Sequence, residues 1–258
     1  MNMETVTYGV HGRYATIEMN RPEVLNAMNG QMLEELLQAF KQAAESEADV
    51  VILSGSGRGF SAGGDIKTML NSMDNEGFSQ VMDLISEVVT TFHTMPKVTI
   101  SAIHGPAAGL GFSLALAADY VVAHSSAVLA MNFIGIGLVP DGGGHYFMKK
   151  RLGETKAKHL IWSGEKLTAD AALNLGLVDQ VTDADLLDTV KTLVGGMLQR
   201  PVKAMVASKN IYSAVGKEEL QQILTLEKET QYNMRQSEDH KEGIKAFLEK
   251  RKPQFTGK

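Results

Sequence analysis

The sequence predicts an α/β fold, and three observations support this prediction. Residues 49–54 and 98–103 are largely apolar, as expected for short strands that are buried on both faces of a sheet. Residues 29–46 place apolar side chains at helical spacing, with Asn29 as the expected N-cap. Each buried strand runs into a glycine-rich turn and then into a helical segment. Short strands that alternate with helices over the first two-thirds of a chain are typical of the α/β class.

The remaining elements follow in chain order. Before the first helix we expect strands at 5–10 and 14–19. Between the two buried strands we expect one helix that begins near Asp65 and another that covers 77–93. After the second buried strand we expect a helix that ends at Ala118, and then strands at 120–123 and 127–130. A helix at 142–150 precedes a mostly helical stretch from Glu154, and the chain closes with helices at 217–235 and 238–250. We therefore expect a core at 1–199 and a helical C-terminal module at 200–258.

The composition narrows the class of protein. The chain has 258 residues, of which 44% are hydrophobic and 21% are charged, so it suits one large globular domain, or a domain with a small appendage. There is no cysteine, and the seven histidines form no metal-binding spacing, so we expect no metal site. A net charge of −5 argues against a nucleic-acid partner. We find no leader pattern and no apolar run of about 20 residues, so we expect a cytoplasmic protein without a membrane partner.

Two loops, at 54–65 and 104–113, share one design in which a glycine-rich turn joins a buried strand to a helix. Such turns present backbone N–H groups at a helix N-terminus, where partial positive charge favours an anion. Two converging loops would each offer one N–H to a single developing oxyanion. The alternative is that the glycines only permit tight turns.

Ser61 lies in a G-x-S-x-G match at 59–63, which is the pattern of the serine-hydrolase nucleophile. That motif requires the strand to run straight into the serine. Here the strand ends near Ser54 and three glycines intervene, so we interpret the match as chance and rank a hydrolase last.

Asp141 stands in the stretch GLVPDGGGHY at 137–146, between an apolar run and a glycine cluster. Two interpretations are open. The carboxylate is a catalytic base whose pKa is raised by its apolar surroundings, or it is the N-cap of the helix at 142–150. The first requires the side chain to point into a cleft.

Several motifs in this order resemble the crotonase (enoyl-CoA hydratase/isomerase) superfamily: NRPEVLNAM at 20–28, FSAGGDIK at 60–67, HGPAAGLGFSLALAAD at 104–119 and AFLEKRK at 246–252. The resemblance implies a spiral of ββα units with a helical C-terminal module that builds homotrimers, often paired into hexamers. It also implies an acyl-coenzyme A thioester as substrate. Coenzyme A is then part of the substrate, and no separate cofactor is expected.

The resemblance also implies roles for individual residues. The oxyanion hole would consist of the backbone N–H groups of Gly64 and Leu110. Contacts with the substrate and its coenzyme A would come from both loops and their neighbours, at Leu25, Ala27, Ala62, Gly63, Asp65, Ile66, Gly109 and Phe133. The apolar residues Phe112, Met131, Phe133 and Phe147 suggest a pocket for the acyl group.

The chain departs from the hydratases of this family in its acids. The two glutamates that add water there would fall at Ser113 and Phe133, and neither of these residues transfers protons as a carboxylate does. Between residues 97 and 149 the acidic residues are Asp119, for which we expect a structural role, and Asp141. Asp141 therefore remains as the candidate base.

The segment around Asp141 resembles the ring-epoxide isomerases of phenylacetate degradation and related enoyl-CoA isomerases, in which an Asp at this place is the base. Moving a double bond needs one base, whereas hydration is easier with two groups. We therefore predict an acyl-CoA isomerase. The alternatives are a hydratase-like lyase in which Asp141 activates water, and a non-catalytic acyl-CoA binder.

Overall fold

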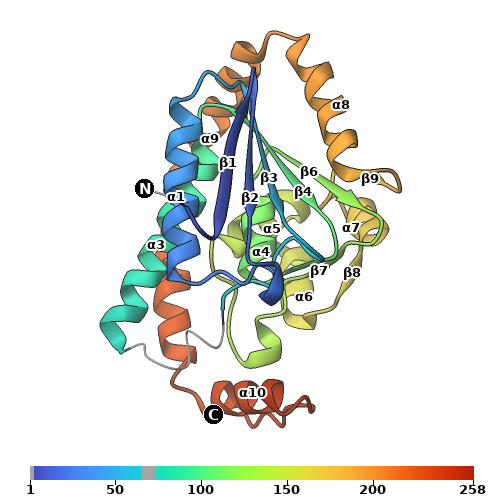
Figure 1. Ribbon diagram of the computed structural model, residues 1–258. Helices are drawn as coiled ribbons and strands as arrows, with labels where there is room; N and C mark the ends of the chain where they lie inside the picture. Colours follow the sequence, from blue (N-terminus) through green and yellow to red (C-terminus); the bar gives the residue numbers. More distant parts are fainter. Residues whose placement is uncertain (1–2, 66–73) are drawn as a thin grey trace.

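The computed structural model describes residues 3–65 and 74–258, and two β-sheets organise them (Figure 1). The main sheet has the order β1-β2-β3-β4-β6-β9, in which β1 and β2 are antiparallel and every later pair is parallel. Its strands are Val6–His11, Tyr14–Met19, Val50–Gly55, Val98–Ile103, Tyr120–His124 and Gln180–Thr182. A small second sheet has the order β5-β7-β8, formed by Pro106–Ala108, Val128–Ala130 and Leu167–Thr168.

The central strand β3 shows how the core is divided between the two faces of the main sheet. All six of its residues are buried. Because side chains alternate along a strand, Val51 and Leu53 enter one apolar cluster, while Val50 and Ile52 enter another. This double burial explains why the strand reads as a continuous apolar run in the sequence.

Helices cover both faces of the main sheet, and Figure 1 shows α1 and α3 side by side along one flank, with α8 on the opposite side. α10 lies at the far end of the molecule, beyond α9. The helices are α1 Gly30–Glu45, α3 Asn75–Thr94, α4 Leu110–Leu116, α5 Gly144–Leu152, α6 Glu154–Ser163, α7 Ala169–Leu175, α8 Leu186–Leu198, α9 Val202–Met234 and α10 Glu238–Leu248, with short 3-10 turns at Pro22–Val24 and Ile134–Ile136.

The predicted α/β class is confirmed, and the strands and helices of the first two-thirds lie within a few residues of their expected positions. Asn29 caps α1 as predicted, since its side chain accepts a hydrogen bond from Met32 N. The sequence missed β5, β8 and β9, because strands of two or three residues are too short to show an alternating pattern. The helix expected to begin near Asp65, and the predicted site residue Ile66, fall outside the described residues.

α9 is longer than expected, because it begins at Val202 and not near residue 217, and it has 33 residues. It packs against α3, α5 and β4, so its C-terminal half lies against the loop and helix that follow Asp141. The division into a core at 1–199 and a C-terminal module at 200–258 stays a prediction.

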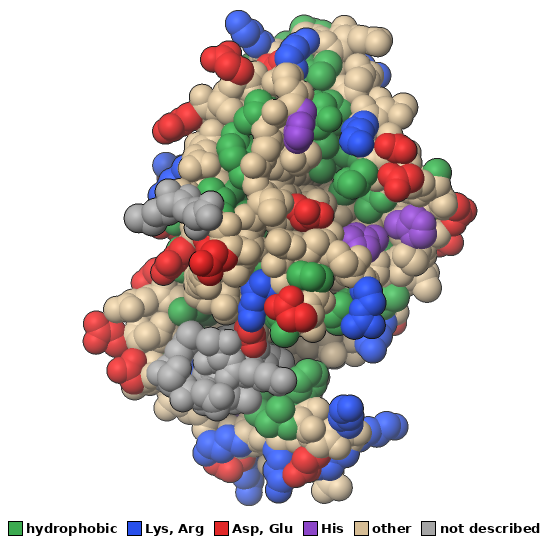
Figure 2. All heavy atoms as spheres, in the orientation of Figure 1, with side chains coloured by type: hydrophobic (Ala, Val, Ile, Leu, Met, Phe, Trp, Pro, Cys, Tyr) green, Lys and Arg blue, Asp and Glu red, His purple; other side chains and the backbone are tan. Residues whose placement is uncertain are grey.

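Charged side chains of both signs are interspersed over the face shown in Figure 2, and Lys and Arg gather at the end formed by α10. Within residues 3–65 and 74–258, no helix combines the length and the apolar character that crossing a bilayer requires.

Candidate active site

Asn26 holds the first glycine loop in place. Its side chain is fully buried, and Nδ2 donates to the carbonyl oxygens of Ser56, Gly59 and Phe60 at 2.9–3.2 Å. Oδ1 accepts from Arg21 N at 2.9 Å. One amide thus ties the turn at 20–28 to the loop at 56–60, which gives the NRPEVLNAM motif a structural reason.

The backbone of the first loop is arranged so that the N–H of Gly64 points away from Met28, the residue with which Gly64 is paired. Met28 N donates to Gly63 O at 2.8 Å, and Asp65 N donates to Met28 O at 3.0 Å. Met28 and Gly64 are therefore paired in a parallel bridge that uses the polar groups on either side of Gly64. Among the described residues, nothing accepts a hydrogen bond from Gly64 N.

The second loop brings Leu110 N close to the first. Gly63 has a φ of 96°, and a Cβ at this position would lie 3.3 Å from Leu110 N and 2.7 Å from Ala108 O. Only glycine suits this conformation and this approach. Leu110 is the first residue of α4, and no acceptor for its N–H occurs in the described part of the chain. The predicted oxyanion donors, Gly64 N and Leu110 N, therefore lie on neighbouring loops, and neither N–H has an acceptor among the described residues.

Gly64, Leu110 and Asp141 line one narrow pocket, although they are far apart in the sequence. The pocket has a volume of about 20 Å³, which is roughly the space of one water molecule. Its wall is completed by the start of α1 and by α3, and the lining residues are Met28, Asn29, Gly30, Leu33, Gly64, Asp65, Val81, Ile85, Leu110 and Asp141.

The pocket around Asp141 is not lined by the apolar residues that the sequence suggested for the acyl group, and their role there stays a prediction. Phe112, Met131 and Phe147 are buried in the core, with at most 3% of each exposed, and they do not line the pocket. Residues of α1 and α3 replace them. The sequence could not show this, because the apolar faces of these helices have the same pattern whether they meet core or substrate.

The structure decides against the N-cap interpretation of Asp141. α5 begins at Gly144 instead of residue 142, and its N-cap residue is Gly143, with a φ of 74°. The N-cap therefore provides no side-chain hydrogen bond to α5. The Asp141 side chain is 6% exposed and lies at the pocket. Its Oδ1 has no hydrogen-bond partner among the described residues, and Oδ2 lies 3.5 Å from Gln231 Nε2.

The electrostatic surroundings of Asp141 favour its protonated form. Burial raises the pKa of this carboxyl well above its ordinary value, and the nearby charge of Glu227 raises it further. A buried carboxyl with one unpaired oxygen and a raised pKa is suited to act as a general base.

Glu227 on α9 is the residue that sequence reasoning missed. It is 3% exposed, and its carboxylate accepts hydrogen bonds from Gly143 N at 2.8 Å and His145 N at 3.1 Å. It also contacts His145 Nδ1 at 2.7 Å. Asp141 is therefore not the lone acid at this place. No local motif could reveal this contact, since Glu227 is 86 positions further along the chain.

Ser113 and Phe133 stand where the family resemblance would place the two glutamates of a hydratase. Ser113 is fully buried, and its hydroxyl lies 3.6 Å from Met131 Sδ. The ring of Phe133 packs against Gly109, where a Cβ would lie 3.6 Å from it. Neither position supplies a carboxylate.

Four of the predicted contact residues are tied to their neighbours by hydrogen bonds or an ion pair around the first loop. Ala62 N donates to Leu25 O at 2.8 Å, and Arg21 donates to Ala27 O at 2.6 Å. Arg21 also forms an ion pair with Asp65 at 3.1 Å, which fixes the rim of the pocket.

Ser61 is unsuited to be a nucleophile. Its side chain is fully buried, its hydroxyl donates to Asn26 O at 2.7 Å, and it accepts from Gly63 N at 3.2 Å. The serine is thus part of the scaffold of the first loop, which agrees with the interpretation of its motif as a chance match.

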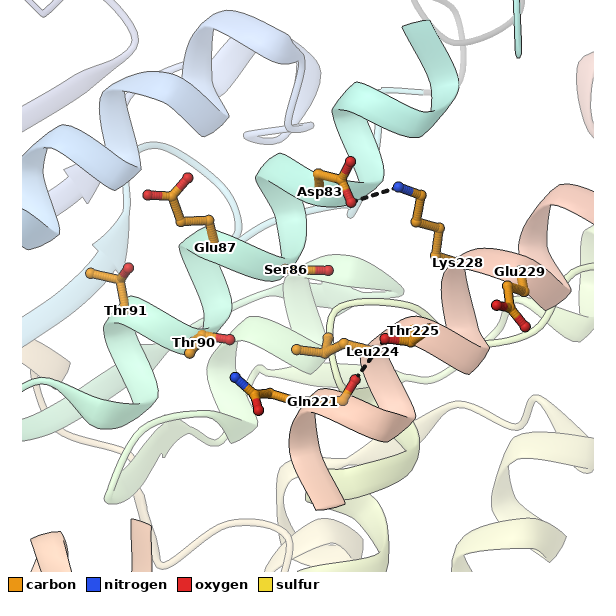
Figure 3. Close-up of a pocket in the computed structure, with 10 residues that line it drawn as sticks. All are labelled: Asp83, Ser86, Glu87, Thr90, Thr91, Gln221, Leu224, Thr225, Lys228 and Glu229. Carbon is orange, nitrogen blue, oxygen red and sulfur yellow. Dashed lines mark hydrogen bonds and ion pairs between the residues drawn. The ribbon is translucent and has the colours of Figure 1, made fainter. Parts of the chain in front are cut away.

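A larger cavity of about 620 Å³ lies elsewhere, between α3 and α9 (Figure 3). It is lined by threonines, carboxylates and a lysine, Lys228, whose Nζ is 2.6 Å from Asp83. None of the predicted site residues lines it. Over the described ranges, no cluster of His, Asp and Glu is arranged to hold a metal ion.

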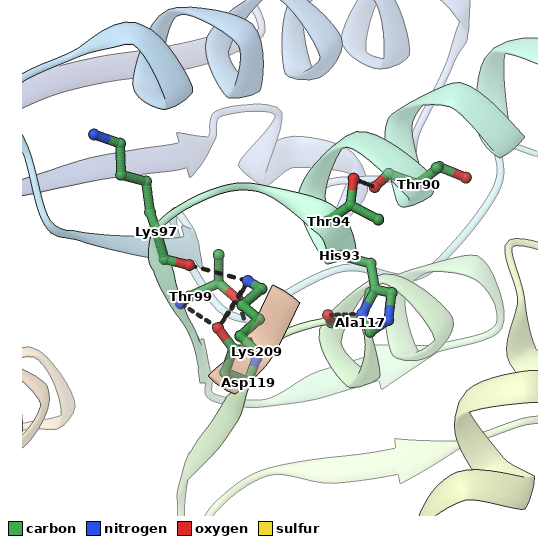
Figure 4. Close-up of polar contacts among 8 residues, drawn as sticks. All are labelled: Thr90, His93, Thr94, Lys97, Thr99, Ala117, Asp119 and Lys209. Atoms are coloured by element: carbon green, nitrogen blue, oxygen red, sulfur yellow. Dashed lines mark hydrogen bonds and ion pairs between the residues drawn. The ribbon is translucent and has the colours of Figure 1, made fainter. Parts of the chain in front are cut away.

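Asp119 has the structural role expected of it. Its Oδ2 accepts from Thr99 N at 2.8 Å and from Lys209 Nζ at 2.8 Å (Figure 4). Asp119, which directly precedes β6, thus joins Lys209 of α9 to Thr99 of β4, and Lys209 also donates to Lys97 O at 3.0 Å.

The sequence is similar to known proteins over nearly its whole length. The family model described as enoyl-CoA hydratase/isomerase matches residues 11–258. YhaR of Bacillus subtilis (strain 168), assigned to the enoyl-CoA hydratase/isomerases, is 53% identical over 98% of this chain and 99% of its own. The 1,2-epoxyphenylacetyl-CoA isomerase of Escherichia coli (strain K12) is 34% identical over 99% and 100% of the two chains.

Solved structures agree with this assignment. The crystal structure of an enoyl-CoA hydratase from Mycobacterium avium subsp. paratuberculosis K-10 superimposes with a TM-score of 0.89, at 30% identity, over 99% of this chain and 100% of that one. The chain belongs to the enoyl-CoA hydratase/isomerase family, and the predicted crotonase-like α/β fold is confirmed.

Proposed function

We propose that the protein is an enoyl-CoA isomerase that moves a double bond of an acyl-CoA thioester, with Asp141 as its single base. One observation carries the proposal. A buried carboxyl without a full set of partners shares a pocket with Gly64 and Leu110, whose N–H groups are unpaired among the described residues. The two positions of the hydratase glutamates hold Ser113 and Phe133.

The reaction follows from this arrangement. The thioester oxygen accepts hydrogen bonds from Gly64 N and Leu110 N, which stabilises negative charge as it develops on that oxygen. Asp141 removes a proton from C2 of a 3-enoyl thioester, and the electrons of the C–H bond move into the conjugated dienolate. The same carboxyl then returns the proton to C4, and the double bond comes to lie between C2 and C3. Each such oxyanion donor is worth about 3 kcal/mol.

The main alternative is a hydratase-like lyase in which Asp141 activates water. Relatives of this chain carry both kinds of name, the isomerase of Escherichia coli and the hydratase of Mycobacterium avium. The isomerase is favoured because Asp141 can take and return the same proton, whereas Asp65 at the rim is paired with Arg21 and the carboxylate of Glu227 accepts hydrogen bonds from Gly143 N and His145 N. Hydration requires water to be activated and a second proton to be delivered.

The direct test is the migration of the double bond in a 3-enoyl-CoA by the wild type and by Asp141→Asn. We expect turnover by the wild type and a loss of about 10²- to 10⁴-fold in the variant, since general-base catalysis has this magnitude. Binding of the thioester should survive, because Asn keeps the shape of the side chain. Equal turnover by both proteins would remove Asp141 from the mechanism.

A parallel assay with a 2-enoyl-CoA separates the alternatives. Hydration that exceeds isomerisation would favour the hydratase-like lyase. Thioester binding without turnover of either substrate would favour the non-catalytic binder.

The substrate contacts and the assembly are also proposals. Leu25, Ala27, Ala62, Gly63, Asp65 and Gly109 frame the loops and are proposed to meet the acyl-CoA. A homotrimer or hexamer is proposed from the family resemblance. It is supported by apolar side chains on α9 that are largely exposed in the single chain, namely Ile211 at 66%, Tyr212 at 72% and Val215 at 82%.

A further inference from the structure

Two successive turns of α9 form hydrogen bonds with the segment that carries Asp141. Gln231 Nε2 donates to Val139 O at 2.6 Å, on the N-terminal side of Asp141. One turn earlier on α9, Glu227 accepts from Gly143 N at 2.8 Å, on the C-terminal side. Residues 227 and 231 are four apart and thus share a face of the helix. Asp141 is suspended between these two attachments.

Glu227 performs the capping that the sequence had suggested for Asp141. The first N–H groups of a helix lack partners within the helix, and a carboxylate is favoured there by the helix dipole. Glu227 supplies this carboxylate to α5 from a distant part of the chain, through Gly143 N and His145 N. Because Glu227 caps the helix, the carboxyl of Asp141 does not, and it faces the pocket instead.

We propose that Glu227 is a positioning residue for the reaction of Asp141: it fixes the loop at 139–145 and holds a like charge near Asp141, which makes the latter a stronger base. The inference rests on the proposed function for its kinetic consequence, but its effect on Asp141 itself can be measured separately.

Among the described residues, few charges lie around Asp141, so that of Glu227 should dominate. From α9 the ionisable group that faces this region is Glu227, and from α5 it is His145, which is engaged with Glu227 at 2.7 Å. Across the pocket lies the Arg21–Asp65 ion pair, whose opposite charges largely offset each other. The pocket side chains that α3 contributes are apolar. Consistently, the charge of Glu227 is the second cause, after burial, of the raised pKa of Asp141.

A purely structural cap makes a different prediction. Loss of such a cap would lower the stability of the fold and leave the ionisation of Asp141 where it is. The titration of Asp141 therefore separates a positioning residue from a helix cap.

The test is an infrared titration of the Asp141 carboxyl in the full-length protein. The band of the protonated form is assigned by subtracting the spectrum of the same protein that also carries Asp141→Asn. Glu227→Gln keeps the size of the side chain and removes its charge, and we expect the midpoint of Asp141 to move to lower pH. Glu227→Asp retains the charge, so its Asp141 midpoint should lie between that of Glu227→Gln and that of the wild type.

Glu219→Gln is the matched control. Glu219 lies on the same helix and also contacts α5, through an exposed ion pair with Lys149 at 2.6 Å with both side chains 46% exposed. This variant changes the net charge equally, and we expect no shift of the Asp141 midpoint. An unchanged midpoint in Glu227→Gln, an equal shift in Glu219→Gln, or a midpoint in Glu227→Asp equal to that of Glu227→Gln would overturn the inference.

Kinetics give the second readout. In Glu227→Gln the plateau of kcat should fall about 10- to 100-fold with little change in KM, because a misplaced and weaker base affects the chemical step. Unchanged kcat in an active enzyme would contradict the inference. A shifted midpoint in a protein without isomerase activity would refute the proposed function and leave the control of Asp141 by Glu227 standing.

Discussion

The two glycine loops and the loop that carries Asp141 are held in place in different ways. The first glycine loop is fixed by the turn about 30 residues before it, since the Asn26 side chain binds carbonyls of the loop and Ser61 donates to Asn26 O. The Asp141 loop is fixed by Glu227 and Gln231, which lie more than 80 residues further along the chain.

This difference follows from what each region must do. The proposed oxyanion donors are backbone N–H groups, and their placement depends on the course of the chain alone. Asp141 is a side chain whose ionisation depends on burial and on neighbouring charge. Such surroundings require groups from elsewhere in the fold, and α9 supplies them.

The largest effect is expected in the glycine loops, from Asn26→Asp. The exchange replaces an amide donor by a carboxyl that faces the oxygens of Ser56, Gly59 and Phe60. Buried groups left without partners cost about 1–3 kcal/mol each, so we expect the free energy of unfolding to fall by about 3 kcal/mol or more. Chemical denaturation measures this change.

Asn29→Asp is the control, because the same exchange occurs three residues later. Asn29 accepts from Met32 N as the N-cap of α1, a role that Asp fills equally well, so its effect should be close to zero. Equal losses in both variants would show that the Asn26 network does not hold the loop.

A smaller effect is expected where the two glycine loops meet, from Gly111→Ala. A Cβ on Gly111 would lie 2.7 Å from Ser61 Cβ and 2.8 Å from Ser61 O. The crowding should cost about 1–3 kcal/mol of stability and lower kcat/KM by shifting Leu110 N relative to Gly64 N. Denaturation and steady-state kinetics are measured on the same preparation.

Gly195→Ala on α8 is the matched exchange, because nothing lies within 4 Å of its added Cβ. An alanine in a helix is about 0.5–1 kcal/mol more favourable than a glycine, so this variant should gain stability. A neutral Gly111→Ala would mean that the two loops do not depend on this close approach.

The two glycine-rich loops that carry the proposed oxyanion donors could be predicted from the sequence, because their signals are local. Gly64 and Leu110 follow buried strands within glycine-rich turns, and the structure places them at one pocket. The fold class was predictable for a similar reason, since β3 and β4 are buried on both faces and read as apolar runs.

The surroundings of Asp141 could not be predicted. The sequence left base and N-cap as open interpretations, and the capping partner proved to be Glu227, which appears in the sequence as one of many glutamates on a charged helix. The pocket wall from α1 and α3 was missed for the same reason. Contacts between distant segments leave no trace in local spacing.

The pH dependence of kcat for double-bond migration in a 3-enoyl-CoA tests the central claim most directly. As the proposed base, Asp141 would act in its ionised form, and burial together with Glu227 raises its pKa above the ordinary value for Asp. We predict that kcat rises with pH through one ionisation above the ordinary range of an Asp carboxyl and then reaches a plateau. A kcat that stays flat across the acid range would contradict the assignment of Asp141 as the base.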